Sequence, residues 1–382
     1  MVRVLLDATA IPPDRRGVGR QLDALVPALA RAGAELHVIC RPGDADHFGE
    51  LSGRDPLVAP AATDRRAVRL VWEQTGLARR VAALRPDVLH SPHYTHPVAA
   101  RVPLVVTIHD ATFFTDPGVH LGVKRVFFQQ ATRLSLRRAA CCLVPSRATA
   151  DELVRVVGAD PDRLVVAYHG VDRGVFHPPT RDEVATVRAE LGLQPGQDYV
   201  AFLGTLEPRK NLVALVQGWV RAASGRPGAP ALVLAGGAGW DERLAAAVAA
   251  VPPGLTVLRP GYLPVESLRA LFGGAAVTAY PSLAEGFGLP VLEAMASGSP
   301  VLTTRRTALP EVGGDAVAYT DVDAASIGAA LTALLDDPAR RGALAAAGVE
   351  RAAGFTWDAC AKAHLDAYER AIAVGVRPWR GR

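Results

Sequence analysis

The chain has few cysteines, and their positions argue against a metal site. Only four occur in 382 residues, and no two of them have metal-site spacing: Cys40, Cys141, Cys142 and Cys360. The histidines of "HSPHYTH" (90–96) could suggest zinc, but neither a cysteine pair nor an HExxH pattern supports that interpretation. We therefore expect no metal, in a reduced, intracellular protein.

Long apolar segments are also missing. No stretch reaches the roughly 18–20 residues that a membrane-spanning helix needs. The N-terminus, "MVRVLLDATAIPPDRR", begins directly with a strand-like run and does not contain the apolar core of a signal peptide. We expect a cytoplasmic protein that is soluble or at most peripheral to the inner face of the plasma membrane.

Net charge is modest, and its distribution argues against nucleic-acid binding. The formal charge is +4 and the pI is about 9.0, which is compatible with anionic small molecules, an acidic membrane surface or nucleic acid. Neither a dense run of Lys and Arg nor a basic stretch rich in aromatics occurs. We therefore expect no nucleic-acid partner.

What the chain does contain is an alternation of short apolar runs and amphipathic stretches. Strands are predicted at 2–7, 35–40, 87–91, 103–110, 141–146 and 163–170, and again at 198–206, 230–237, 255–261, 275–282, 300–304 and 316–320. Apolar runs separated by helices are typical of parallel sheets covered on both faces. Two such series in 382 residues predict an α/β protein of two Rossmann-like domains.

The boundary between these domains is expected near residue 178, where Pro178 and Pro179 interrupt the pattern. The first domain would then span residues 1–178 and the second 179–356. A closing helical stretch, 357–382, follows the last repeat.

The stretch "PSLAEGFGLPVLEAMASGSP" (281–300) places Glu285 and Glu293 around a glycine-rich turn at the end of a predicted strand. We expect a helix of about two turns with Glu293 in its first turn. Its N-terminus faces the loop and could receive phosphate oxygens. The loop and helix start comprise Gly286, Phe287, Gly288 and Leu289. The structural alternative is that Glu293 complements the helix dipole while Glu285 is solvated.

A second candidate follows the first strand of the second domain, in "FLGTLEPRKNL" (202–212). Arg209 and Lys210 together suit a diphosphate, because a guanidinium binds phosphate by a bidentate fork and an ammonium binds it as a point charge. Gly204 has no side chain, so a ligand could approach the backbone closely at this position. A solvated pair at a helix start is the alternative.

Two features of the first domain complete the set. His109 ends a strand in "VVTIHD" and could face a ligand or serve packing alone. Gly17 and Gly19 lie between the first strand and the first helix, after a long loop. They fit a dinucleotide fingerprint poorly, because Arg41 stands where a ribose-binding acid belongs. We interpret this loop as a flexible lip that approaches the ligand.

Together, "EGFGLPVLEAMASGSPV", "FLGTLEPRKN", "TIHD", the "GVGR" loop and "GVD" with its downstream "F" and "P" resemble retaining glycosyltransferases of GT-B fold, family 4, over nearly the whole chain. The closest likeness is to bacterial mannosyltransferases. The resemblance implies two Rossmann-like domains that face each other across a cleft, with the closing helix packed back on the first domain. It also implies catalysis without a divalent metal or other cofactor.

The resemblance also implies roles for individual residues. Glu285 would contact the transferred sugar and Glu293 the ribose hydroxyls. Arg209 and Lys210 would neutralise the diphosphate, helped by amides after Gly286. His109 would touch the sugar, and Tyr262 and Leu263 would lie near the nucleobase. Thr205 departs from the pattern, because some members carry an arginine there.

The expected function is transfer of a hexose, with mannose first, from a nucleoside-diphosphate sugar to a hydroxyl acceptor in envelope polysaccharide or glycolipid assembly. Alternatives are a secondary-metabolite glycosyltransferase, a sugar-nucleotide epimerase or phosphorylase, and a non-catalytic nucleotide-sugar-binding protein. We expect Glu285→Ala to abolish transfer while sparing nucleotide affinity. The basic stretch 122–142, with its phenylalanines, could contact an anionic membrane or could pack as an ordinary amphipathic helix.

Overall fold

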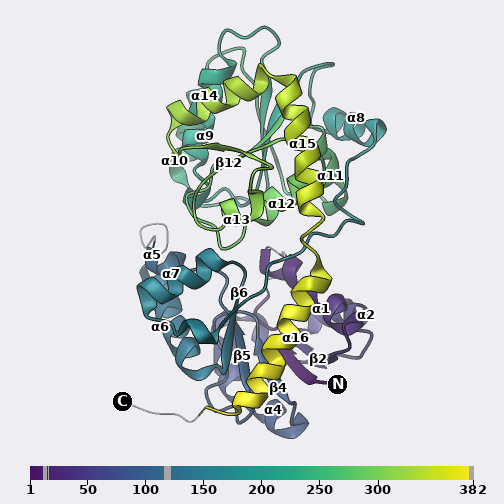
Figure 1. Ribbon diagram of the computed structural model, residues 1–382, viewed down its shortest axis with the longest axis vertical. Helices are drawn as coiled ribbons and strands as arrows, with labels where there is room; N and C mark the ends of the chain where they lie inside the picture. The colour runs from purple at the N-terminus through teal and green to yellow at the C-terminus, as the bar shows by residue number, and fades with distance from the viewer. Residues whose placement is uncertain (12–14, 16, 116–121, 378–382) are drawn as a thin grey trace. The chain divides into compact units, whose positions relative to one another are not determined.

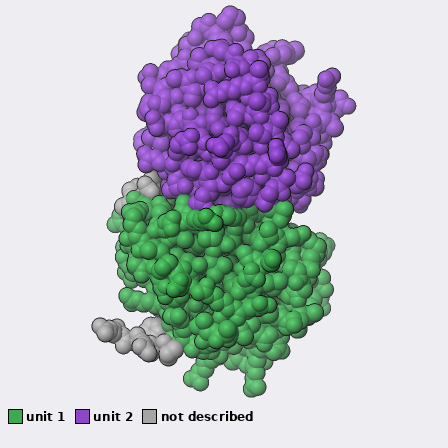
Figure 2. Space-filling view, viewed as in Figure 1, with its two compact units in different colours: residues 1–170, 356–382 green, residues 171–355 purple. Residues whose placement is uncertain are grey.

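The computed structural model describes residues 1–11, 15, 17–115 and 122–377. Contacts divide the chain into two compact units (Figures 1 and 2): unit 1 comprises Met1–Gly170 and Thr356–Arg382, and unit 2 comprises Val171–Phe355. The division falls before residue 178 because Pro178 and Pro179 pack against Gly298 and Gly273 within unit 2.

Unit 1 is built on a parallel sheet of seven strands in the order β3-β2-β1-β4-β5-β6-β7. The strands are β1 (Arg3–Asp7), β2 (Glu35–Cys40), β3 (Leu57–Val58), β4 (Val88–Ser91), β5 (Leu104–Thr107), β6 (Cys141–Val144) and β7 (Leu164–Val166). The two-residue edge strand β3 was not predicted, because so short a run shows no periodicity. Strand order reverses between β1 and β4, which makes a switch point at their carboxyl ends.

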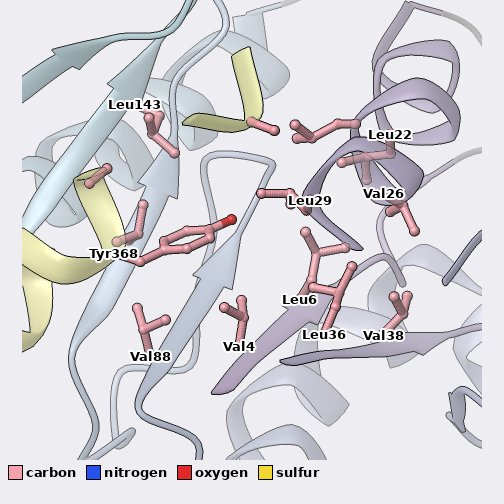
Figure 3. Close-up of a cluster of buried hydrophobic side chains, with 14 of the residues drawn as sticks. Val4, Leu6, Leu22, Val26, Leu29, Leu36, Val38, Val88, Leu143 and Tyr368 are labelled. Atoms are coloured by element: carbon pink, nitrogen blue, oxygen red, sulfur yellow. The ribbon is translucent and has the colours of Figure 1, made fainter. Parts of the chain in front are cut away.

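Alternate strand residues of unit 1 serve two separate cores. Val4 and Leu6 point into one core, whereas Leu5 points into the other, as the two-residue period of a strand requires. Helix α16 (Trp357–Val374) belongs to the first core, where its Tyr368 lies beside Val88 and Leu143 (Figure 3). The last helix is thus an integral part of unit 1.

The remaining helices of unit 1 flank this sheet. They are α1 (Gly17–Arg31), α2 (Ala45–Ser52), α3 (Arg66–Trp72), α4 (Ala78–Leu84), α5 (Thr112–Thr115), α6 (Gly122–Arg138) and α7 (Arg147–Val157). Helices α1 and α2 cover the same face as α16, and α4, α6 and α7 cover the opposite face.

Unit 2 repeats the plan with a parallel sheet of six strands in the order β10-β9-β8-β11-β12-β13. Its strands are β8 (Tyr199–Leu203), β9 (Ala231–Ala235), β10 (Val257–Gly261), β11 (Val277–Tyr280), β12 (Val301–Thr304) and β13 (Ala318–Thr320). The switch point of this sheet lies between β8 and β11.

Helices cover both faces of the unit 2 sheet. They are α8 (Arg181–Glu190), α9 (Leu212–Ala223), α10 (Glu242–Ala249), α11 (Val265–Gly273), α12 (Leu289–Ala296), α13 (Leu309–Gly313), α14 (Ala324–Leu335) and α15 (Pro338–Ala352). Figure 1 shows α9, α10 and α14 on one side of this sheet and α8, α11 and α15 on the other. In the described part of the chain, every helix is too short or too polar to cross a membrane.

Candidate functional site

Two loops flank the switch point of unit 2 and bring its charged residues together. The loop after β8 carries Arg209 and Lys210 on a 3-10 turn, and the loop after β11 carries Glu285. Strands β8 and β11 are neighbours, so both loops leave the sheet at the same edge. A backbone hydrogen bond from Leu283 N to Arg209 O, 2.9 Å, joins them.

Glu285 is a buried carboxylate that accepts from both cations. Its Oε2 lies 2.7 Å from Arg209 Nη1, and its Oε1 lies 2.6 Å from Lys210 Nζ. Ser282 Oγ donates a further hydrogen bond to Oε1 at 2.7 Å. Burial alone raises the pKa of Glu285, but Arg209, Lys210 and these hydrogen bonds outweigh it and lower the pKa to about 2. Glu285 is therefore a fixed anion at neutral pH, and the idea that it is solvated is wrong.

Each cation has further partners that fix its position. Glu207 Oε1 accepts from Arg209 Nε at 3.1 Å and from Nη2 at 2.7 Å. Lys210 Nζ also donates to Tyr280 Oη at 2.5 Å, and Tyr280 is fully buried. Burial lowers the pKa of Lys210, the adjacent Arg209 lowers it further, and Glu285 opposes the change. We name Arg209, Lys210 and Glu285 the charged triad.

The partners Glu207, Tyr280 and Ser282 were not identified from the sequence. Glu207 lies two residues from Arg209, and Ser282 lies three residues from Glu285. Tyr280 is the last residue of β11 and is indistinguishable in the sequence from an ordinary strand residue. A polar residue within a few positions of a candidate charge is the signal that could have found Glu207 and Ser282.

Helix α12 begins at Leu289, so Glu293 lies in its second turn and the expectation of a first-turn position is wrong. Gly288 precedes the helix with a φ of 101°, which favours glycine, and the turn places Glu293 in a buried position. Phe287 is buried as well and meets Phe355 edge-on, with ring centroids 6.0 Å apart. Phe287 therefore contributes packing to the loop.

The loop after β9 lies directly against the loop that carries the cations. A Cβ at Gly236 would lie 2.2 Å from Gly204 O, and one at Gly239 would lie 1.8 Å from Leu206 O. Glycine at both positions permits this close approach of two backbones.

Tyr262 and Leu263 follow the next strand, β10, at the same edge of the sheet. The side chain of Tyr262 is 67% exposed, and Leu263 is partly buried. Trp240, in the loop after β9, is a second exposed aromatic residue at this edge.

His109 lies in unit 1, two residues beyond β5. Its Nε2 donates to Pro92 O at 2.7 Å, which assigns the proton of the neutral ring to Nε2 and leaves Nδ1 as an acceptor. Burial lowers the pKa of His109, while the Pro92 hydrogen bond and Asp110 oppose the change. At neutral pH the ring is therefore uncharged.

The two glycines near the N-terminus lie inside helix α1, which begins at Gly17, rather than before it. Gly19 is buried, and a Cβ there would lie 3.1 Å from the Ile11 side chain and 3.3 Å from that of Arg15. Gly17 is exposed, and apart from its neighbours along the chain no atom of the described residues lies within 4 Å of a Cβ placed there. Residues 12–14 and 16 of the predicted lip lie outside the described residues.

Of the two phenylalanines of helix α6, Phe128 is buried and Phe127 is partly buried, so Phe128 is not available to a membrane surface. Phe128 is buried and stacks on Phe113 at a centroid distance of 4.7 Å. The exposed surface near the start of the helix is instead formed by Val123, Lys124 and Val126.

Comparison with known proteins identifies the family. The profile described as Glycosyltransferase Family 4 matches residues 15–174, and that of Glycosyl transferases group 1 matches residues 183–351. The chain is 32% identical over 284 residues to O-antigen chain mannosyltransferase B of Escherichia coli, covering 74% of each chain. It is 36% identical over 332 residues to a D-inositol 3-phosphate glycosyltransferase of Mycobacteroides abscessus, covering 78% of this chain and 71% of the relative.

Solved structures show the same fold at low sequence identity. Sucrose-phosphate synthase from Thermosynechococcus elongatus aligns with a TM-score of 0.78 and 21% identity, covering 98% of this chain and 100% of that one. Anabaena HepE, solved in complex with UDP-glucose, aligns with a TM-score of 0.76 and 17% identity, covering 97% of this chain and 99% of that one. The chain therefore belongs to glycosyltransferase family 4 (group 1), and it is a retaining glycosyltransferase of GT-B fold that transfers a sugar from a nucleotide-sugar donor.

Proposed function

We propose that the charged triad binds the diphosphate of a nucleoside-diphosphate hexose. The observation that carries this proposal is a guanidinium and an ammonium held by one buried carboxylate at the switch point of a Rossmann-like sheet. Ligands of such sheets bind beyond the strand ends at that point. Two fixed cations there suit an anion with several oxygens.

The remaining contacts follow the sequence expectations. Glu285 contacts the transferred sugar while it holds the cations, and Glu293 binds the ribose hydroxyls. Backbone amides from Gly286 to Leu289 assist Arg209 and Lys210 at the phosphates. The other proposed contacts are Gly204 beside the diphosphate, Tyr262 and Leu263 at the nucleobase, Gly17 and Gly19 near the donor, and His109 at the sugar.

The reaction we propose is a front-face substitution with retention. The bond from the anomeric carbon to the phosphate oxygen breaks as the acceptor oxygen bonds to the same carbon. The acceptor proton passes to the departing diphosphate. Arg209 and Lys210 stabilise the negative charge that develops on the leaving group, because they are already oriented before reaction. No residue is assigned to a metal or another cofactor.

Stereochemistry tests this mechanism directly. Proton NMR of the product formed in the first minutes should show the anomeric configuration of the donor. A product of inverted configuration would rule out front-face substitution at this site.

For the donor we propose GDP-mannose, and for the acceptor a saccharide hydroxyl, free or lipid-linked, in envelope polysaccharide or glycolipid assembly. The relative named as an O-antigen mannosyltransferase supports this choice. A thermal-shift panel of GDP-mannose, UDP-glucose and UDP-N-acetylglucosamine tests it, because at equal concentration the ligand that binds more tightly stabilises the folded state more. If a UDP sugar stabilises the protein selectively, that sugar nucleotide and not GDP-mannose is the donor. If the best acceptor is a small aglycone, a secondary-metabolite pathway is favoured.

Peripheral contact with an anionic membrane is a separate proposal. It is supported by the exposed surface at the start of α6, which carries Val123, Lys124 and Val126. Sedimentation with vesicles of phosphatidylglycerol and phosphatidylcholine at low salt tests it. Lys124→Glu should weaken binding, and absence of wild-type binding would remove the membrane from the account.

A further inference from the structure

The backbone that carries Glu285 is anchored by a row of threonine hydroxyls from the next strand and its loop. Thr303 Oγ1 donates to Tyr280 O at 2.8 Å, and Thr304 Oγ1 donates to Ser282 O, also at 2.8 Å. The first bond joins the last registered pair of β11 and β12, and the second joins residue 304 to the loop after β11.

Thr307 ends this row and bonds to Glu285 itself. Its Oγ1 accepts from the backbone N–H of Glu285 at 2.8 Å. The φ of Thr307 is +48°, a left-handed conformation that is strained for a β-branched residue. Such a conformation persists only where the surrounding structure imposes it, and strained residues of this kind cluster at functional sites.

We infer that Thr307 is a positioning residue for the donor diphosphate, acting through Glu285. Its hydroxyl fixes the backbone of Glu285, whose carboxylate in turn holds Arg209 and Lys210 at 2.7 and 2.6 Å. The inference rests on the proposed function, in which the diphosphate binds at the charged triad. Thr307 acts on that binding through Glu285 and need not touch the ligand. Thr307 adopts this left-handed conformation while its hydroxyl accepts from Glu285 N.

Three substitutions separate the hydroxyl from the strain. Thr307→Ser keeps the acceptor oxygen and should bind nucleoside diphosphate like the wild type. Thr307→Val keeps the shape and the strain but loses the oxygen. Thr307→Gly loses the oxygen and relieves the strain, so its melting temperature should be no lower than that of the wild type. This variant can therefore be measured even if the valine variant fails to fold.

Calorimetric titration with GDP, GMP and guanosine, and with UDP, UMP and uridine, measures the affinity of each variant for the diphosphate and for the nucleoside. Both Thr307→Val and Thr307→Gly should weaken diphosphate binding about five- to tenfold, the scale of one lost hydrogen bond. Nucleoside binding should be unchanged. Thr332→Val is the matched control, because its Oγ1 bonds Gly328 O inside α14, away from the triad.

The outcomes separate two failures. If the wild type binds neither diphosphate, the proposed function fails. If it binds one and the glycine variant binds it equally well, the role of Thr307 is overturned. Equal weakening for nucleoside and diphosphate would also overturn it, since that indicates general loss of loop structure.

Discussion

Lys210 and Glu285 form a buried ion pair, with Nζ 2.6 Å from Oε1 and only 8% of each side chain exposed. Arg209 completes the triad from the other carboxylate oxygen. An uncompensated charge in such a position is costly, so the three charges depend on one another. A change to one of these charges should therefore alter both the stability of unit 2 and its affinity for a diphosphate, as the first two predictions state.

Glu285→Ala should destabilise unit 2 by about 3–5 kcal/mol, because it leaves buried Lys210 without its counter-charge. It should also weaken diphosphate binding, since the cations lose their orientation. Urea unfolding and calorimetric titration measure the two effects. Asp336→Ala, which removes an exposed partner of Arg226, is the control and should cost under about 1 kcal/mol.

This expectation differs from that of the sequence alone, in which Glu285→Ala spares nucleotide affinity. The sequence shows which charges are present but not that one carboxylate bonds both cations. Unchanged affinity in the alanine variant would favour the simpler role of Glu285 as a sugar contact.

Diphosphate affinity should decrease as pH rises, because protonated Lys210 attracts phosphate and neutral Lys210 does not. Burial lowers the pKa of Lys210 from its ordinary 10.5, so the loss should begin at lower pH than for an exposed lysine. Titrations between pH 7 and 10 measure it. Lys210→Arg, whose guanidinium stays charged, should hold its affinity across this range. Parallel profiles for the two proteins would exclude Lys210 as the titrating group.

Unit 1 should lose stability in mild acid. Among the described residues of this unit, burial lowers the pKa of six histidines: His90, His93, His96, His109, His169 and His364. Below the ordinary pKa of 6.5 the unfolded chain binds protons that the folded unit does not, so stability falls as pH drops from about 6.5 towards 4.

Thermal melting across this pH range checks the prediction. His96→Asn removes one group, whose pKa burial lowers to about 4, and should make the decline shallower. His37→Asn, at a partly exposed position in β2, is the control. A melting temperature that stays constant from pH 7 to pH 5 would contradict the account.

The four cysteines should be unreactive in the folded protein. Each is buried and free, and burial raises their pKa values to about 11 or 12. Cys141 and Cys142 point into opposite cores, so they are not poised to pair. Ellman's reagent should label four thiols in guanidinium and essentially none at pH 8 without it. Fast native labelling would show that unit 1 opens far more often than this packing implies.

Much of the architecture was accessible from the sequence. Twelve strands were predicted, because continuous apolar runs between amphipathic stretches are a strong signal, and each overlaps a strand of the two sheets. The two-residue β3 carries no such signal. The sequence places the start of α1 too late, because Gly17 and Gly19 suggest a loop. Both lie inside the helix, and at Gly19 the nearby Ile11 side chain favours glycine.

The charged residues of the candidate site can be predicted from the sequence, but the hydrogen bonds that link them cannot. Arg209, Lys210 and Glu285 were identified from their positions after strands, and the structure brings these three together. The hydroxyls of Tyr280 and Thr307 were missed, because their roles depend on strand register and on a backbone conformation. Neither has a periodic signature in the sequence.

Binding of a nucleoside diphosphate by the wild type and by Lys210→Met tests the central claim most directly. The triad predicts that the wild type binds GDP or UDP more tightly than the matching nucleoside. Lys210→Met should lose at least tenfold of diphosphate affinity, about 1.4 kcal/mol, with nucleoside affinity unchanged. Equal diphosphate affinity in the two proteins would contradict a phosphate site at the charged triad.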